Sequence, residues 1–588
     1  MTYRKFEPEK YKSELKKIWR EIQKLGKLNH GNLRAILHKY PKDGDKIFSK
    51  DQLVQGFHWL GIERLPSILT KRPVRSISGV TTVTVLTRPF PCPGKCIFCP
   101  NDITMPKSYI ASEPGAQRAL ANRFDPYNQV YNRLKALHQI GHPTQKIELL
   151  VLGGTWSYYP ESYQIWFINR CFEALNNFDP DKIDNEITDR RIVDYEKFND
   201  NLRRQIGEKS YNALIKSDLY KERFERIIDP AVGSALWEEL AEQQKSNEST
   251  HSRNVGLVLE TRPDTLDEKE VLKLRKFGAT KIQIGVQTLD PEVNKANKRF
   301  ESVEQIKLAF GLLRQAGFKI HAHVMPNLYK STPEKDLQTY HKLFNDLHYK
   351  PDELKIYPTS TIKHTELHEL YQKGRYKPYT TKMLISLLAQ MIEETPRYCR
   401  LSRIIRDIPS NDIEAGNKKT NLRQLVEDKL KKENRKNHNI RAREIRNNNF
   451  DPKKIKYKES KYDTNISTEY FLEYTTSDDK LLGFLRLSIP HKRTNSVTSE
   501  LDDSAIIREI HVYGPAQNIE SDTSNETNRA KKAQHIGLGT KLIMQAEQIS
   551  KKHERAKVNV ISAIGTRKYY QGRGFKNGTL YQYKKLSP

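Results

Sequence analysis

The stretch "RPFPCPGKCIFCPND", residues 88–102, holds three of the five cysteines in this chain of 588 residues. Cys92, Cys96 and Cys99 follow a C-x3-C-x2-C spacing, and a proline–glycine pair after the first cysteine permits a sharp turn. Three thiolates on one tight loop can reach three corners of a small iron–sulfur cluster and leave one iron without a protein ligand. Zinc is the weaker alternative, because no fourth Cys or His lies in this loop.

Short apolar runs precede and follow this loop along the chain. They alternate with amphipathic helical stretches such as "ESVEQIKLAFGLLRQAG" (301–317), a pattern typical of parallel βα units whose sheet is covered on both faces. We therefore predict an α/β fold with a partial barrel of six strands, the first of which runs directly into the cysteines. The predicted strands are "VTTVTVL" (80–86), "IELLVLGG" (147–154), "VGLVLET" (255–261), "KIQIGVQ" (281–287), "KIHAHVM" (319–325) and "ELKIYPT" (353–359).

Polar or glycine residues follow several of these strands. Barrel enzymes place their chemistry at the carboxyl ends of the strands. Gly153 and Gly154 end the second strand, where they form either a point of close backbone approach or an ordinary turn. Glu260 and Gln287 end the third and fourth strands, and we interpret both as candidate cofactor contacts.

The net charge of +29 is the first indication of a partner. Residues 1–75 carry 18 basic and 8 acidic side chains, and residues 418–446 carry 11 and 4. Phosphate contacts supply most non-specific affinity for nucleic acids, so two basic segments beside a catalytic region indicate an RNA or DNA partner. The alternative is a solvated lysine-rich surface.

The length of the chain requires more than one domain. The N-terminus has no apolar signal region, and no segment approaches the ~18–20 apolar residues of a membrane span, so we expect a cytoplasmic protein with no membrane contact. The predicted parts are a basic helical segment (1–75), the barrel (76–400) with a helical insertion at about 178–252, a basic linker module (401–460) and a second α/β domain (461–588).

The second α/β domain contains a glycine-rich turn, "QHIGLG" (534–539), before a predicted helix. Backbone N–H groups at such a helix start can bind a pyrophosphate. A dinucleotide-binding fold is disfavoured, because the turn lacks the GxGxxG pattern. Two tyrosines, Tyr569 and Tyr570, follow in "GTRKYYQGRGF", where ordinary packing is the alternative to a catalytic role.

The cysteine spacing, with Phe98 before the third cysteine, resembles the motif of radical S-adenosylmethionine (SAM) enzymes. The resemblance implies that Cys92, Cys96 and Cys99 hold a 4Fe-4S cluster whose open iron binds SAM. It further implies that the Gly153–Gly154 pair approaches the methionyl amine and that an external electron donor is needed. Cys171 and Cys399 lie in apolar patterns and are expected to be core residues.

The order of elements in the second α/β domain is similar to that of GNAT acetyltransferases, in which the glycine turn holds the diphosphate of coenzyme A. The resemblance implies that a tyrosine near the last helix faces the thioester. The acetyl-CoA contacts implied are Lys146, Glu509, Ile510, His511, Val512, Gln534, His535, Ile536, Gly537, Leu538, Gly539 and Tyr570.

The combination of both domains resembles the catalytic subunit family of Elongator and its single-chain archaeal and bacterial counterparts. Stretches that carry the resemblance include "KIELLVLGGT" (146–155), "IQIGVQT" (282–288), "REIHVYG" (508–514) and "QHIGLG" (534–539). The resemblance implies a tRNA carboxymethyluridine synthase that acts on the wobble uridine of the anticodon stem-loop with acetyl-CoA as carbon donor. Lys146, Tyr569 and Tyr570 are the catalytic residues that it implies.

Two departures and two alternatives accompany this prediction. The first cysteine spacing is shorter than is frequent in the family, and Cys99 is followed by "PND" instead of "PGG". A protein lysine acetyltransferase, with the barrel as an RNA-binding scaffold, is the main alternative, and it predicts activity without SAM. A non-catalytic iron–sulfur tRNA-binding module would leave "QHIGLG" unused. The sequence leaves monomer and homodimer open.

Overall fold

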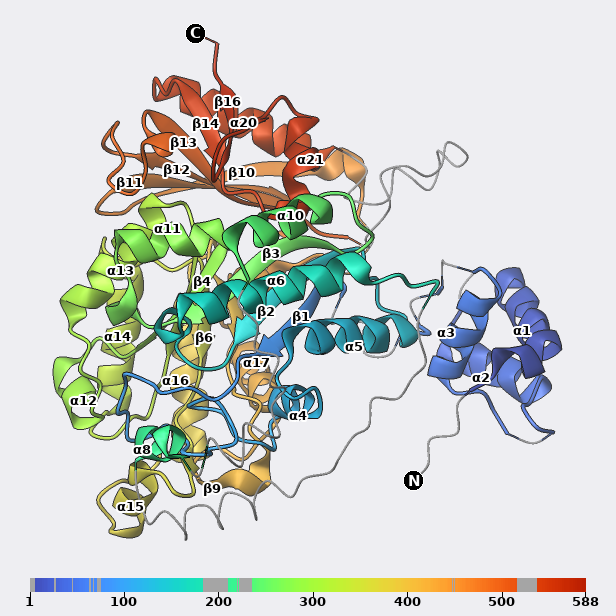
Figure 1. The fold of residues 1–588 in the computed structure, drawn as a ribbon, viewed down its shortest axis with the longest axis horizontal. Helices are drawn as coiled ribbons and strands as arrows, with labels where there is room; N and C mark the ends of the chain where they lie inside the picture. The colour runs from blue at the N-terminus through green and yellow to red at the C-terminus, as the bar shows by residue number, and fades with distance from the viewer. Residues whose placement is uncertain are drawn as a thin grey trace.

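The computed structural model describes residues 6–587 except 26–27, 45, 63–64, 67, 71–75, 183–209, 219, 221–234, 447, 449 and 515–536. Figure 1 shows three parts: N-terminal helices set off to one side, a helix-covered barrel sheet, and a second α/β part stacked on one end of the barrel. None of the helices that the structure describes combines the length and apolar composition needed to span a bilayer.

The N-terminal part consists of short amphipathic helices. Leu15, Ile18 and Ile22 lie three or four residues apart, so they share one face of the first α-helix and are buried against the next two. Asn29 caps the second helix by accepting a hydrogen bond from the backbone of Asn32. The elements are η1 (Pro8–Tyr11), α1 (Lys12–Lys24), α2 (His30–Lys39) and α3 (Lys50–Trp59).

The barrel sheet has seven strands in the order β1-β2-β3-β4-β5-β6-β8, and every neighbouring pair is parallel. The six predicted strands are confirmed. The seventh strand, β8, was not predicted, because its four residues, "RLSR", are too few to show an alternation. The strands are β1 (Thr81–Leu86), β2 (Lys146–Leu152), β3 (Arg253–Thr261), β4 (Lys281–Gln287), β5 (Lys319–Val324), β6 (Glu353–Ile356) and β8 (Arg400–Arg403).

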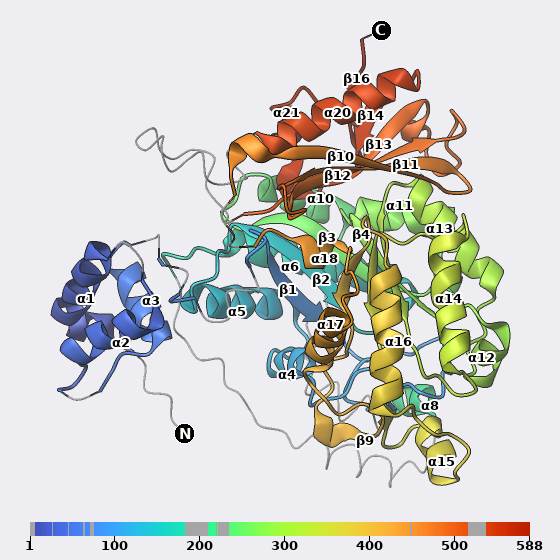
Figure 2. The same ribbon diagram turned by 180° about the vertical axis from the view of Figure 1, so that it is seen from behind.

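Helices cover the outer face of this sheet, as Figures 1 and 2 show from opposite sides. Ile147, Leu149 and Val151 of β2 point outward and are buried under them, and Cys171 and Cys399 are fully buried in the same core, as expected. The helices are α4 (Pro114–Ala121), α5 (Pro126–Gln139), α6 (Glu161–Asn177), α8 (Tyr211–Lys216), α10 (Trp237–Asn247), α11 (Glu268–Lys276), α12 (Pro291–Ala296), α13 (Val303–Gln315), α14 (Pro333–Asn345), α15 (Glu366–Gln372) and α16 (Thr381–Glu394).

The segment expected as a basic linker contains helices packed onto the barrel. Leu422, Val426 and Leu430 repeat every four residues along one helix and are buried in the core that the barrel helices share. The segment contains α17 (Leu422–Lys432), α18 (Ile440–Arg443) and β9 (Ile413–Ala415), and β9 pairs with β7 (Thr361–Ile362).

The second sheet is mixed, in the order β10-β11-β12-β13-β14-β16-β15. Its first strand begins at Lys456, a few residues before the predicted domain start at 461. Only β13 and β14 pair in parallel. The elements are β10 (Lys456–Asp463), β11 (Ser467–Thr475), β12 (Leu481–Pro490), β13 (Ser504–Val512), α20 (Leu538–Lys552), β14 (Lys557–Val560), α21 (Arg567–Gln571), β15 (Lys576–Asn577) and β16 (Gln582–Lys585).

Buried ion pairs join the two sheets. Asp352, at the start of β6, accepts hydrogen bonds from Arg508 of β13 at 2.7 and 2.6 Å, and Arg486 of β12 lies 3.4 Å away. Burial alone would raise the pKa of Asp352, but the two guanidinium groups outweigh it and hold the pKa at about 2. The amino-terminal ends of the barrel strands therefore face the second sheet, and the cysteine loop lies at the opposite ends.

Candidate active site

The cysteine loop follows β1 and is held by groups from distant parts of the chain. Asn212 of α8 accepts a hydrogen bond from the backbone N–H of Cys92 at 2.9 Å and donates one to its carbonyl at 2.7 Å. A Cβ atom at Gly94 would lie 2.5 Å from Nη1 of Arg262, so the guanidinium group packs directly against the turn. The predicted insertion thus contributes a helix that fixes the loop.

Positive charge surrounds the second cysteine. Nη1 of Arg299 lies 3.9 Å from Sγ of Cys96, and the buried Glu301 forms ion pairs with both Arg299 and Arg262. A hydrogen bond with the Cys99 thiol and the charges of Arg299 and Arg262 lower the pKa of Cys96 to about 5, against the effect of burial. The loop therefore stabilises a thiolate at Cys96 before any metal binds.

The three thiols fit a cluster better than a single ion. Among the described residues, no three Cys, His, Asp or Glu side chains converge as ligands of one metal ion. Zinc needs all its ligands within ~2.3 Å of one point, whereas thiolates that bind different irons of one cluster need not converge. Cys92, Cys96 and Cys99 all line one cavity, so each can reach a group placed there.

The glycine pair after β2 is required by close contacts. Gly153 has a φ of 133°, and a Cβ atom there would collide with Oγ1 of Thr87. A Cβ atom at Gly154 would lie 2.7 Å from the Tyr159 hydroxyl. Both glycines line the same cavity as the cysteines, and the backbone N–H of Gly154 donates a hydrogen bond to Oγ1 of Thr87 at 3.2 Å.

Glu260 and Gln287 line the cavity at the carboxyl ends of β3 and β4. Burial raises the pKa of Glu260, whose Oε1 lies 3.7 Å from Nδ1 of His323. Gln287 has a φ of 63°, a strained conformation for a residue with a side chain, and its buried Oε1 has no hydrogen-bond partner among the described residues. Such an unpaired amide oxygen suits a polar ligand.

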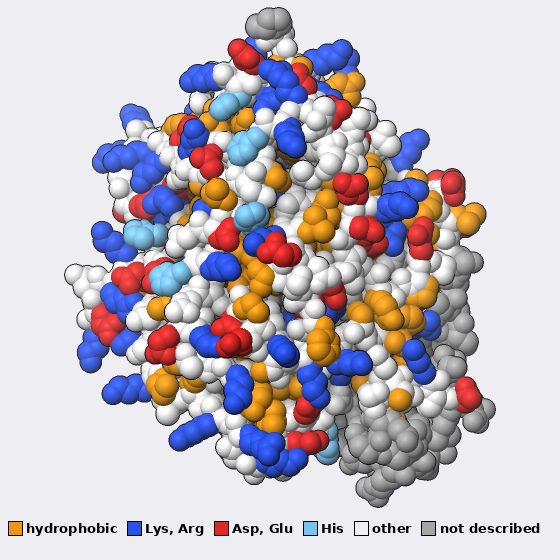
Figure 3. Space-filling model, turned by 90° about the vertical axis from the view of Figure 1, so that its left-hand side faces the viewer, with side chains coloured by type: hydrophobic (Ala, Val, Ile, Leu, Met, Phe, Trp, Pro, Cys, Tyr) orange, Lys and Arg blue, Asp and Glu red, His pale blue; other side chains and the backbone are white. Residues whose placement is uncertain are grey.

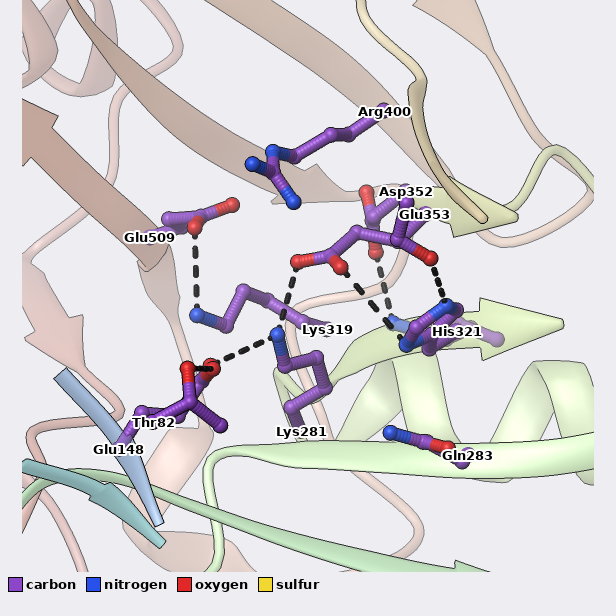
Figure 4. Close-up of polar contacts among 12 residues, drawn as sticks. Thr82, Glu148, Lys281, Gln283, Lys319, His321, Asp352, Glu353, Arg400 and Glu509 are labelled. Carbon is purple, nitrogen blue, oxygen red and sulfur yellow. Dashed lines mark hydrogen bonds and ion pairs between the residues drawn. The ribbon is translucent and has the colours of Figure 1, made fainter. Parts of the chain in front are cut away.

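The inner face of the barrel sheet is polar and charged. Lys281 lies between Glu148 at 2.8 Å and Glu353 at 2.9 Å, as Figure 4 shows. Burial alone would lower the pKa of Lys281, but the two carboxylates outweigh it and raise the pKa above its usual value. The interiors of closed barrels are mostly filled by branched apolar side chains. Here the lumen remains open and is lined by paired charges.

Sequence reasoning missed these lumen residues, although a signal was present. In "KIQIGVQ", "KIHAHVM" and "ELKIYPT" polar side chains occupy every second position, so one face of each predicted strand is polar. The apolar positions predict the strands, and the polar positions between them indicate a second face that contacts polar groups. The missed residues are Lys281, Gln283, Lys319, His321, His323, Glu353 and Lys355.

In the second sheet, strands β13 and β14 stop pairing just before the predicted acetyl-CoA contacts of β13. β13 pairs with β14 only over Ser504–Ile507, so Ile510, His511 and Val512 lie beyond that pairing and line the cavity. Beyond Ile507, this side of β13 is therefore not used in pairing with β14 and faces the cavity.

The side chain of Glu509 points toward the barrel, where it forms an ion pair with Lys319 at 3.2 Å (Figure 4). It forms a second ion pair with Arg486 at 2.8 Å. Burial alone would raise the pKa of Glu509, but these two cations hold it at about 2. Its carboxylate is therefore engaged in joining the two sheets, and its contribution to a ligand site is the strand backbone.

The glycine turn is partly described, since Gln534, His535 and Ile536 lie outside the described residues. Gly537 caps α20 with a φ of 67°, and Gly539 lies so close to the Tyr569 hydroxyl that a Cβ atom would collide with it. The side chain of Leu538 is buried in the core. Both glycines line the cavity at the start of the helix, where backbone N–H groups favour an anion.

The two tyrosines differ in their surroundings. The ring of Tyr569 lies under Arg573, whose guanidinium carbon is 3.6 Å from the ring centroid. Tyr570 is 5% exposed and packs edge-on against Phe575 at 5.6 Å. Both line the cavity, but only Tyr569 has its hydroxyl at the start of α20.

One cavity of about 2720 Å³ connects all these groups. It extends from the cysteine loop through the lumen to Gly537 and Tyr569 of the second sheet. Lys146, at the start of β2, lines it near the second sheet, and burial lowers the pKa of its amine.

Comparisons with known proteins identify both the barrel and the whole chain. Residues 214–343 match the Radical SAM superfamily, and residues 351–432 match the Radical_SAM C-terminal domain. The superfamily implies a 4Fe-4S cluster and SAM, and the thiolate-stabilising loop fits this cluster. The sequence is 35% identical over 534 residues to tRNA uridine(34) acetyltransferase of Methanocaldococcus jannaschii, covering 88% of this chain and 87% of that protein.

The chain is also similar to a eukaryotic relative and to a solved structure. The chain is 31% identical over 541 residues to Elongator complex protein 3 of Schizosaccharomyces pombe, covering 89% of this chain and 88% of that protein. The structure of archaeal Methanocaldococcus infernus Elp3 with an N-terminal deletion matches with a TM-score of 0.66 at 31% identity, covering 87% of this chain and 100% of that one. The chain therefore belongs to the family of tRNA uridine(34) acetyltransferases and Elongator complex protein 3, and it carries a radical SAM domain.

Proposed function

We propose that this protein is a tRNA-modifying enzyme that uses SAM and acetyl-CoA to form 5-carboxymethyluridine at the wobble uridine. The observation that carries the proposal is the single cavity that connects the cysteine loop with the glycine turn of the second sheet. A carbon–carbon bond between an acetyl group and a base requires the radical source, the acyl donor and the base to share one closed space.

The barrel residues hold and orient the radical source. Cys92, Cys96 and Cys99 ligate the cluster, which together with SAM and an external electron donor supplies the radical chemistry when bound. The charges of Arg299 and Arg262 favour the thiolate form of Cys96. The Gly153–Gly154 backbone, Glu260 and Gln287 contact SAM, in a cavity wall that limits access of water.

The second sheet holds the acyl donor. The N–H groups after Gly537 bind the diphosphate of acetyl-CoA, and the open edge of β13 beyond Ile507 takes the extended arm. Tyr569 and Lys146 lie along the path toward the lumen, where they orient the thioester. The acetyl methyl group thereby reaches the lumen, where the radical derived from SAM would take one hydrogen atom from it. Its carbon would add to C5 of the base, which would then lose its C5 proton and one electron, with SAM as the net oxidant, and hydrolysis of the thioester would release CoA and leave a carboxymethyl group.

Basic side chains beside the cavity opening bind the RNA backbone. Strands β1 and β8 are the two edges of the open barrel, and arginines flank both. On the outer face in Figure 3, by contrast, Lys and Arg side chains are interspersed with Asp and Glu. Residues 1–75 provide a further basic surface for the tRNA of this cytoplasmic enzyme. The basic residues that line the cavity include Lys107, Arg118, Arg133, Arg403, Arg406, Arg423, Arg441 and Arg446.

The alternative of a protein lysine acetyltransferase is less well supported. An acyl site for a protein substrate needs an approach from the surface, whereas Gly539 and Tyr569 belong to the cavity that continues into the barrel. The relatives that cover most of the chain are also named for uridine(34) or for Elongator.

Isotope transfer to RNA tests the proposal. Anaerobically reconstituted protein with dithionite, SAM, labelled acetyl-CoA and unmodified tRNA should place label at the wobble uridine. The Cys96→Ala variant should place none, because its cluster lacks a ligand. Equal labelling by the variant would rule out the radical mechanism, and labelling of lysines without SAM would favour the alternative.

A further inference from the structure

Three polar side chains from neighbouring strands form one contact group in the middle of the lumen. Nζ of Lys355 in β6 donates a hydrogen bond to Oε1 of Gln283 in β4 at 2.5 Å, and Nε2 of His323 in β5 lies 3.1 Å from the same oxygen. The three residues are 6%, 2% and 4% exposed, and all of them line the cavity. Their polar atoms thus face the cavity without reaching bulk solvent.

This group, Gln283, His323 and Lys355, lies between the two ends of the reaction path. Gln283 is two residues after Lys281, which belongs to the end near the second sheet, and four residues before Gln287 at the cysteine end. At ~3.3 Å per residue, these separations are about 7 and 13 Å. A planar base held here would lie between the acyl donor and the radical source.

Hydrogen-bond donors predominate in this group. Among the described residues, both side-chain hydrogen bonds of Gln283 involve its Oε1 and none involves its Nε2, and the Lys355 ammonium has three donor hydrogens but one described acceptor, Oε1 of Gln283. Burial lowers the pKa of Lys355 to about 8, so the amine is still largely protonated at neutral pH. The ring of Tyr357 lies 5.7 Å from that of His323 and provides an aromatic wall.

We propose that Gln283, His323 and Lys355 form the binding site for the target uracil, with the amide of Gln283 and the ammonium of Lys355 donating to its carbonyl oxygens. This assignment rests on the proposed function. Enzymes that act on a base read its polar edge by hydrogen bonds and hold its face against aromatic side chains. The donors select the 4-oxo group of uracil, because the 4-amino group of cytosine would place a donor against donors.

Binding measurements with the full-length protein test the assignment without requiring turnover. The probes are two anticodon stem-loop RNAs that differ only in uridine or cytidine at the wobble position, each titrated against wild-type protein and the Lys355→Met and Gln283→Met variants. Wild-type protein should bind the uridine RNA about tenfold more tightly. Both variants should bind the two RNAs with nearly equal affinity, because phosphate contacts remain while the donors are lost.

A matched substitution and a second readout exclude a purely structural effect. Lys342→Met, on the exposed side of α14, should keep the tenfold preference. Each variant should still cleave SAM to 5′-deoxyadenosine at a rate near that of wild-type protein, which reports an intact cysteine end. Variants that cleave SAM and still prefer the uridine RNA tenfold would overturn the assignment. If wild-type protein modifies no RNA yet shows the preference, the proposed function fails and the base site stands.

Discussion

The two faces of the barrel sheet differ in nearly every residue. On β5 the outward side chains Ile320, Ala322 and Val324 are buried under helices, whereas Lys319, His321 and His323 point into the lumen. The outer face stabilises the fold by apolar burial, of order 25 cal/mol per Å². The inner face consists of charges that stabilise little by themselves. On β5, the even-numbered side chains therefore pack in the apolar core of the fold, and the odd-numbered side chains face the cavity in which the chemistry takes place.

The largest effect on stability is expected from breaking the inner charge group. Lys281→Met leaves the buried Glu353 carboxylate and the partly buried Glu148 carboxylate without their shared ammonium. The free energy of unfolding, measured in urea, should fall by about 3–5 kcal/mol. Adding Glu148→Gln and Glu353→Gln should restore most of the loss, because no buried charge then lacks a partner. If Lys281→Met alone were as stable as wild-type protein, the lumen would contain more water than the burial of these side chains indicates.

The outer face should respond to truncation by a different mechanism. Ile320 is fully buried, so Ile320→Ala should lower the free energy of unfolding by about 2–4 kcal/mol through lost burial and a cavity. Per folded molecule, cleavage of SAM should remain unchanged, because no lumen group moves. A variant that loses SAM cleavage while remaining folded would contradict the division between the two faces.

The junction of the two sheets should make stability depend on pH. The pKa of Asp352 is about 2 in the folded protein against an ordinary value of 3.8, so its carboxylate stabilises the protein above that range by about 2 kcal/mol. This contribution should be lost as the pH falls from 3.8 to about 2. The difference in unfolding free energy between wild-type protein and Asp352→Asn should therefore shrink in that window. If the difference in unfolding free energy stays the same across this pH window, a group other than Asp352 titrates there.

An exposed ion pair should matter least. Lys298 and Glu366 lie 2.7 Å apart, but their side chains are 47% and 43% exposed. Glu366→Gln should therefore change the free energy of unfolding by less than about 1 kcal/mol, and added salt should abolish the difference. A loss as large as that of Lys281→Met would mean that exposure does not separate the two kinds of pair.

Much of this architecture was predictable because its signals are local. The strands with outward residues such as Leu149 and Ile282 are short segments rich in apolar side chains, and the cysteine spacing lies within one loop. What the sequence could not reveal depends on tertiary contacts. The clamp of Asn212 on Cys92 joins residues 120 positions apart, and the turn of Glu509 toward Lys319 follows from how the second sheet meets the barrel. The four-residue β8 gave no pattern at all.

The shared cavity implies a destination for one hydrogen atom of the acetyl methyl group. If the acetyl group reaches the cysteine end through the lumen, acetyl-CoA with a fully deuterated methyl group should pass deuterium into the 5′-deoxyadenosine formed in the presence of unmodified tRNA. Mass spectrometry of the nucleoside measures this directly. The account predicts one deuterium per 5′-deoxyadenosine in turnovers that modify the RNA. Modified RNA accompanied by unlabelled 5′-deoxyadenosine would contradict it.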